Sequence, residues 1–181
     1  MHPRTCELSD YLDRQRAILR AAFESVPSPL QGSRPAPDRW SVAEIIQHLS
    51  IVEERIGRRL SQQIAEAQSA GLPPETSEAP ILPTLDLPRF EDRSRRVSAP
   101  DFAVPTIPMT ADEAWDALEE STKLVREALR LGDGCDLGAL NSPHPRLGQL
   151  SVYHWFAFIG AHEGRHAAQI RELAAAMQTD R

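Results

Sequence analysis

The chain is poor in cysteine and has no long apolar run, and each shortage excludes a class of protein. Its 181 residues include only two cysteines, Cys6 and Cys135. Neither belongs to a Cys-x-x-Cys motif, so we expect neither a disulfide framework nor a dithiol redox site. No stretch approaches the ~18 consecutive apolar residues of a membrane span, and residues 1–7 form no apolar signal region. We therefore expect a protein of the reducing cytoplasm with no membrane partner.

The chain also lacks a concentration of basic charge. Lysine and arginine total 20 against 26 acidic residues, which gives a formal net charge of -6. Binding to nucleic-acid phosphates requires a basic face, whereas the basic residues here are scattered. We expect no nucleic-acid partner. The length suits one substantial hydrophobic core, so we predict a single domain over residues 1–181.

Alternation of apolar and polar residues, which is typical of half-buried strands, is missing over any useful length, so no sheet is expected. Apolar residues instead recur at steps of three and four, the spacing of amphipathic helices. This pattern predicts four helices, over residues 5–26, 41–64, 110–132 and 148–177. The second and third helices each begin with a capping box, Ser41 with Glu44 and Thr110 with Glu113.

A long connection joins the second and third predicted helices. Residues 71–108 are rich in proline and show no sustained period, although Ile81 and Phe90 are suited to packing on a bundle. Such a length can return the chain to the same end, so that these two helices run parallel. The sequence therefore predicts an all-α four-helix bundle with up-down-down-up topology and a long proline-rich crossover between helices two and three.

Three histidines fall on buried helix faces. His162 and His166 are four residues apart, so they share one face of the last helix, and His48 lies on the apolar side of the second. A buried imidazole without partners costs on the order of 1–3 kcal/mol. Three histidines with an open fourth position are typical of catalytic zinc sites, and imidazole also suits nickel. We predict one divalent metal, zinc or nickel, bound by these three side chains.

The three histidines also admit an interpretation without a metal. The three could be core side chains satisfied by protein groups, although three converging on one core favour a metal. The remaining histidines, His2, His144 and His154, are expected in a terminus, a turn or a helix surface, outside the site.

Taken together, these motifs resemble the DinB-like (DinB/YfiT-type) metal-binding bundles over residues 34–173. The resemblance rests on Trp40-Ser41-Val42-Ala43-Glu44, His48-Leu49, Glu53, His144-Pro145, Gly148-Gln149-Leu150-Ser151, Trp155, Phe158-Ile159, His162, Arg165-His166 and Gln169-Ile170. It implies the same up-down-down-up bundle and a metal triad at His48, His162 and His166. It also implies a possible homodimer.

Members of that family with assigned activities are metal-dependent transferases and isomerases that use low-molecular-weight thiols such as bacillithiol or mycothiol, and one branch is described as metal-dependent hydrolases. The resemblance implies a thiol S-transferase or a hydrolase acting on a small molecule, with a thiol as possible cosubstrate. The rival is a binding or stress-response bundle whose metal is structural or vestigial. The sequence does not decide whether the chain is an enzyme.

Glu163 is the one candidate catalytic residue. With His162 and His166 it forms a His-Glu-x-x-His pattern, in which it would be the general base of a metalloprotease. The charged Arg165, the short tail after His166 and the lack of a sheet argue against a protease. Glu163 lies about 100° around the helix from His162, so we expect a solvated surface glutamate, with a base near the metal as the alternative.

Two further expectations concern groups around the ligands. Gln169 follows His166 by one turn and is placed to hydrogen-bond the free nitrogen of a ligand ring, which fixes the ring's orientation in metal sites. Glu53 and Arg165 both belong to the resembled pattern, and we expect them to pair between helices two and four.

Overall fold

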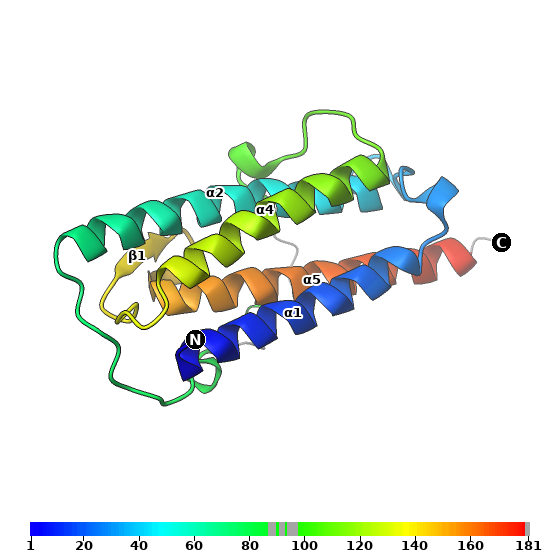
Figure 1. Cartoon of the computed structure of the whole chain (residues 1–181). Coiled ribbons are helices and arrows are strands. Elements are labelled where there is room, and N and C mark those ends of the chain that lie inside the picture. The colour runs from blue at the N-terminus through cyan, green and yellow to red at the C-terminus, as the bar shows by residue number, and fades with distance from the viewer. Residues whose placement is uncertain (87–89, 91–92, 94–97, 180–181) are drawn as a thin grey trace.

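The computed structural model describes residues 1–86, 90, 93 and 98–179, and four long helices dominate this part of the chain (Figure 1). They are α1 (Pro3–Glu24), α2 (Val42–Ser69), α4 (Ala111–Leu131) and α5 (Val152–Thr179). Both predicted capping boxes are present, and they fix where α2 and α4 begin. The predicted four-helix bundle is confirmed. The described residues contain no helix long and apolar enough to span a membrane.

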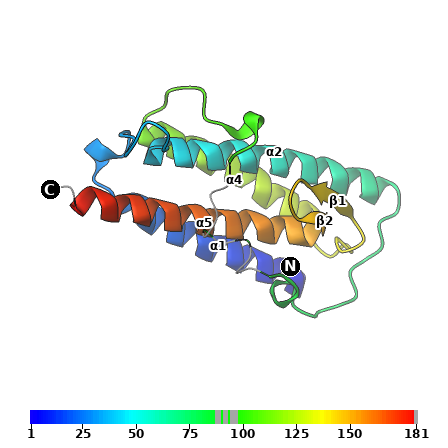
Figure 2. The ribbon, with the colours of Figure 1, turned by 180° about the vertical axis from the view of Figure 1, so that it is seen from behind.

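The helices run up, down, down and up. Glu53 contacts Thr122 near the middle of α2 and α4, and Gln68 donates to the carbonyl of Leu131 near their ends. Because these contacts advance along both helices in the same direction, α2 and α4 are parallel, as predicted. Figures 1 and 2 show the same arrangement from opposite sides. The crossover therefore returns the chain along the full length of the bundle.

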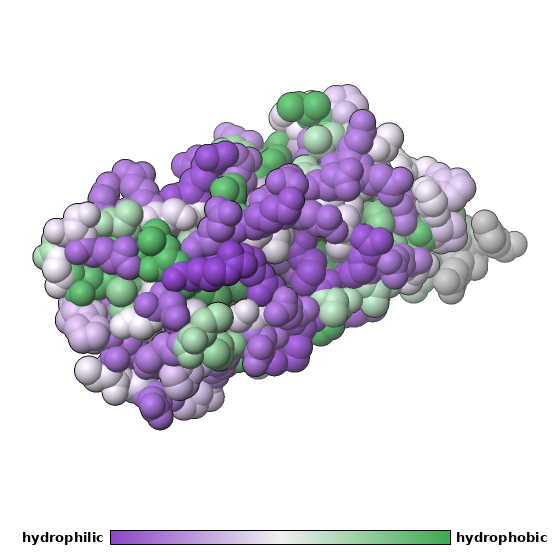
Figure 3. Space-filling view, in the orientation of Figure 1, coloured by the Kyte–Doolittle hydropathy of each residue, from purple (hydrophilic) through white to green (hydrophobic). Residues whose placement is uncertain are grey.

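The bundle is built from two tightly packed pairs, α2 with α4 and α1 with α5. Glycine allows each close approach. A Cβ atom at Gly57 would lie 3.2 Å from the Cβ of Leu124, and one at Gly160 would lie 2.5 Å from the ring of Tyr11. The outer face along α1 and α4 is mainly hydrophilic (Figure 3). The functional side chains must therefore be sought between the two pairs.

A small β-hairpin precedes α5, so the prediction that the chain has no sheet is wrong. Strands β1 (Asn141–His144) and β2 (Gly148–Ser151) pair antiparallel, with Asn141 opposite Ser151 and His144 opposite Gly148. Each strand has four residues, β1 has no buried residue and only the last two residues of β2 are buried, so neither carries the alternating apolar residues by which a strand is recognised in sequence. The residues predicted as the start of the last helix, 148–151, belong to β2.

The crossover packs on the bundle, as predicted. Its described residues include two 3-10 turns, η2 (Leu82–Thr84) and η3 (Asp101–Ala103), and another such turn, η1 (Ser28–Leu30), lies between α1 and α2. Ile81 is 5% exposed, and the ring of Phe90 lies 6.1 Å from that of Phe158. The prediction for the rest of the crossover falls partly on residues 87–89, 91–92 and 94–97, which lie outside the described residues.

The apolar core is divided into two clusters. One surrounds the end at which α1 begins and includes Leu8, Leu60 and Phe156, while the other surrounds the opposite end and includes Leu19, Ile45 and Ile170. Between them each helix contributes one polar side chain to a layer that we call the polar layer: Arg16 of α1, Glu53 of α2, Thr122 of α4 and Glu163 of α5.

Candidate metal centre

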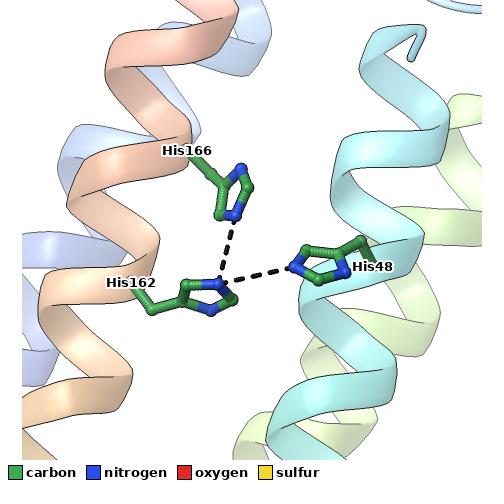
Figure 4. Close-up of side chains that lie close together, drawn as sticks. All are labelled: His48, His162 and His166. Atoms are coloured by element: carbon green, nitrogen blue, oxygen red, sulfur yellow. Dashed lines mark hydrogen bonds between the residues drawn. The ribbon is translucent and has the colours of Figure 1, made fainter. Parts of the chain in front are cut away.

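The three histidines predicted as ligands come together between α2 and α5 (Figure 4). The Nε2 atom of His162 lies 3.4 Å from Nε2 of His48 and 3.1 Å from Nε2 of His166. One nitrogen of each ring lies within 4.8 Å of the others. Nitrogens held at ~2.0–2.1 Å by one tetrahedral ion are about 3.3 Å apart, so the two distances from His162 fit a shared divalent metal.

In His48 and His166, a hydrogen bond at Nδ1 determines that Nε2 is the nitrogen with an available lone pair. Nδ1 of His48 lies 2.7 Å from the carbonyl oxygen of Ala103, and Nδ1 of His166 lies 2.9 Å from Oε1 of Gln169. Both oxygens can only accept, so each Nδ1 donates and each Nε2 keeps a lone pair directed at the common point. The prediction for Gln169 is confirmed.

Burial holds all three imidazoles in the neutral form. It is the main cause that lowers the pKa of His48, and it lowers the pKa of His162 and of His166 well below the usual range. The neighbouring imidazoles and the guanidinium of Arg165 lower the pKa of His162 and His166 further. Neutral imidazole is the form that ligates a metal, so no ring has to lose a proton at neutral pH.

Aromatic side chains pack against the rings of His48 and His162. The ring of Trp40 lies 5.0 Å from that of His48, and Phe158 stacks on His162 at 5.4 Å with an interplanar angle of 17°. His48 and His166 are buried, whereas His162 is only partly buried. Aromatic rings thus pack against two of the three imidazoles.

Glu163 lies in the polar layer and not on the helix surface. Glu163 is 2% exposed, so the expectation of a solvated glutamate is wrong. Its Oε1 accepts from Nη2 of Arg16 at 2.7 Å, and the same nitrogen lies 3.0 Å from Oε2 of Glu53 and 2.6 Å from the Thr122 hydroxyl oxygen. Glu163 is therefore ion-paired with Arg16 of α1 and is not a free carboxylate beside the histidines.

The expected pair of Glu53 with Arg165 is also wrong, because Glu53 pairs with Arg16 instead. Burial and the nearby carboxylate of Glu163 raise the pKa of Glu53 well above its usual range, and Arg16 offsets only part of this. One guanidinium faces two buried carboxylates, so the layer favours retention of a proton on Glu53.

Two groups of the site were missed in the sequence. The Ala103 carbonyl carries no sequence signal, because any residue has a backbone oxygen. Arg16 did carry one: it lies four residues after Leu12 and three before Leu19, on the buried stripe of α1, where a charge requires a buried partner.

The other histidines lie outside the triad. His2 caps α1 through the Arg4 amide, and His154 lies 3.2 Å from the Thr84 hydroxyl. His144 was expected in a turn but ends β1, and its half-buried ring lies 4.7 Å from that of Phe158.

The sequence model of the DinB superfamily matches residues 11–170. The uncharacterized protein YuaE of Bacillus subtilis (strain 168) is 25% identical over 147 residues, which cover 77% of this chain and 80% of YuaE. The crystal structure of TT2238, a four-helix bundle protein, is similar with a TM-score of 0.62 and 14% identity, and the match covers 93% of this chain and 98% of that one. At this identity the structural likeness bears on the fold alone.

Proposed function

The chain belongs to the DinB superfamily, and we propose on this basis that it binds one divalent metal, zinc or nickel, through His48, His162 and His166 and catalyses a reaction of a small molecule there. One observation carries the proposal: His48 and His166 each donate from Nδ1 to a fixed acceptor, which directs both Nε2 lone pairs at the point that His162 Nε2 also faces.

The donor set determines the chemistry that we propose. A divalent metal with three imidazole ligands keeps an open position, at which it lowers the pKa of a bound thiol or water and so supplies a nucleophile at neutral pH. Thiol transfer and hydrolysis both use this chemistry, and we place the thiol S-transferase first because the resembled family includes such enzymes.

The surrounding residues have positioning roles in this proposal. Ala103 and Gln169 hold the rings of His48 and His166 in the ligating orientation. Phe158 stacks on the ring of His162, and the tilted ring of Trp40 packs against that of His48. The Arg16 to Glu163 ion pair anchors α5 one residue from His162, so Glu163 is assigned to positioning and not to general base catalysis. The proposal accordingly includes no peptidase.

Metal analysis tests the first half of the proposal. Protein purified without affinity tag or chelator should contain about one equivalent of divalent metal by mass spectrometry, since three neutral imidazoles form a tight site. His48→Ala, His162→Ala and His166→Ala should each lose it. His154→Ala, a histidine of α5 outside the triad, is the matched control and should retain it. A folded wild-type protein that takes up neither zinc nor nickel would refute the proposal.

An activity screen tests the second half. The metal-loaded protein is mixed with low-molecular-weight thiols and small electrophiles, and separately with small esters and amides. Thiol conjugation that is lost in the three triad variants and kept in His154→Ala would support the transferase. Turnover of esters or amides with the same dependence would favour the hydrolase. Activity in the triad variants equal to that of the wild type would exclude chemistry at this site.

A further inference from the structure

Arg59 of α2 is a half-buried cation without a carboxylate partner among the described residues. Its guanidinium carbon lies 3.8 Å from the centroid of the Trp155 ring. Its Nε and Nη2 atoms are buried, and neither has a hydrogen-bond partner within the part of the chain that the structure describes. Four other partly buried arginines each pair with a carboxylate: Arg4 with Glu75, Arg16 with Glu53 and Glu163, Arg93 with Glu172, and Arg126 with Asp13.

The unpaired nitrogens of Arg59 are the pair that binds a carboxylate side-on. Arg93 shows the arrangement in this protein, because its Nε and Nη2 donate to the two oxygens of Glu172 at 2.8 and 2.6 Å. Such a fork is the geometry by which arginine recognises carboxylates. Burial of the same fork without an anion is unfavourable, so Arg59 has a binding capacity that the described residues do not use.

Two of the described groups near Arg59 are a second cation, Arg55, and a neutral imidazole, His144. Burial lowers the pKa of Arg59, and the neighbouring guanidinium of Arg55 lowers it further. Burial, Arg59 and Arg146 lower the pKa of His144 to about 4, so this imidazole is neutral at pH 7. Its Nδ1 accepts from the backbone amide of Arg146 at 3.1 Å, which leaves the proton of the neutral ring on Nε2. His144 thus adds a second hydrogen-bond donor.

This cationic group lies on the same side of α2 as the triad. Arg55 and Arg59 follow His48 by seven and eleven residues, close to two and three full turns, and so share its face at about 10 and 16 Å along the axis. Ring contacts through Trp155 and Phe158 of α5 connect His144 with the triad. The ring of His144 lies 5.1 Å from Trp155 and 4.7 Å from Phe158, which stacks on His162.

We propose that Arg59, with Arg55 and His144 beside it, binds a carboxylate group of the substrate or thiol cosubstrate whose reacting end lies at the histidine triad. The assignment of the reacting end rests on the proposed function. The two buried nitrogens become accessible when the guanidinium moves off the Trp155 ring, so binding of a carboxylate changes the environment of this tryptophan.

Fluorescence titration of the metal-free, full-length protein tests the anion subsite without reference to the metal. Hexanoate and hexan-1-ol are the probes, since they share an apolar chain and differ in charge. Hexanoate should change the tryptophan emission saturably and bind about tenfold or more tightly than the alcohol, as expected for a charge-assisted fork. Arg59→Met keeps an unbranched chain over Trp155 and should abolish the preference.

Two matched variants separate binding from folding. Arg58→Met removes a neighbouring charge that is exposed and paired with Glu54, and it should keep the preference for hexanoate. Arg55→Met, at an exposed position, should reduce the preference by a smaller factor than Arg59→Met. Equal affinity for hexanoate and hexan-1-ol in the wild type, or equal preference in Arg59→Met and Arg58→Met, would overturn the proposal.

The metal content distinguishes a failure of this inference from a failure of the proposed function. Arg59→Met should bind as much zinc as the wild type. A protein that binds hexanoate through Arg59 but takes up no metal would refute the proposed function alone. In the zinc-loaded protein, ω-mercaptoalkanoates of increasing chain length should bind more tightly than the matching alkanoates at the length that spans both groups. No gain at any length would overturn the assignment to the triad's substrate.

Discussion

The Nδ1 atom of His48 lies 2.7 Å from the carbonyl oxygen of Ala103, a residue of the crossover 55 positions away in sequence. The crossover also reaches the other side of the triad, because Arg93 contacts Gln169, which in turn accepts from His166. The connection between α2 and α4 is therefore part of the site: it orients one ring directly and another through a glutamine.

Removal of the metal should lower the melting temperature. A ligand that binds only the folded state stabilises it by about 2.7 kcal/mol at a hundred times its dissociation constant. Calorimetry of zinc-loaded protein with and without chelator should show the shift, and His166→Ala should remove it, while His154→Ala should behave as the wild type. Identical melting curves, in protein shown to hold one zinc, would contradict the coupling.

Loss of the Gln169 acceptor should weaken metal binding. Gln169→Leu leaves Nδ1 of His166 without its partner at 2.9 Å, and outer partners of this kind are worth about 10–100-fold in metal affinity. Gln169→Glu keeps an acceptor at this position and should retain most of the affinity. Competition with a fluorescent zinc chelator measures both variants. Equal affinities in the leucine and glutamate variants would show that the hydrogen bond does not matter.

Removal of Arg16 should destabilise the bundle strongly. Arg16→Met removes the cation that faces Glu53 and Glu163 and leaves the carboxylate of Glu163 buried without its partner, a change that costs on the order of 3–5 kcal/mol. Arg20→Met, which breaks the exposed pair with Glu24 on the same helix, should cost less than about 1 kcal/mol. Urea denaturation gives both free energies of unfolding. Similar losses in the two variants would argue against the buried network.

The metal-free protein should lose stability as the pH falls below about 6.5, the ordinary pKa of histidine. The folded-state pKa of His162 is lowered, so below pH 6.5 the imidazole binds a proton more readily in the unfolded chain than in the folded protein. The contribution is present above pH 6.5 and is lost as the pH falls toward the folded-state pKa. His162→Gln should have a shallower slope by at most ~1.4 kcal/mol per pH unit. Parallel wild-type and variant profiles between pH 7 and 5 would contradict the prediction.

The bundle and its topology follow from signals that each segment carries by itself. The spacing of apolar residues predicts the helices, the Ser41 and Thr110 boxes mark two helix starts, and the length of the crossover predicts that α2 and α4 are parallel. The positions of His48, His162 and His166 on inward faces follow from the same spacing. Their role as metal ligands stays a prediction.

Other features depend on how helices are rotated against one another, which a single helix pattern does not contain. Glu163 was placed about 100° from His162 and assigned to solvent, but in a bundle this direction faces α1 and Arg16. The partner of Glu53 could not be found for the same reason. The hairpin before α5 has strands of only four residues, and buried and exposed residues do not alternate along β2, so it leaves no hydrophobic pattern.

The polar layer has a consequence for how the bundle can vary. Each helix contributes one member, so sliding any helix by a turn, about 5.4 Å, would separate a buried charge from its partner. The layer therefore fixes the positions of the four helices along the bundle axis, and it also fixes His162, which is adjacent to Glu163 in α5. Side chains in the two apolar halves can then be exchanged for others of similar total volume while the three imidazoles stay in line. A bundle of this kind can therefore change the apolar side chains around its site while the three histidines keep their positions.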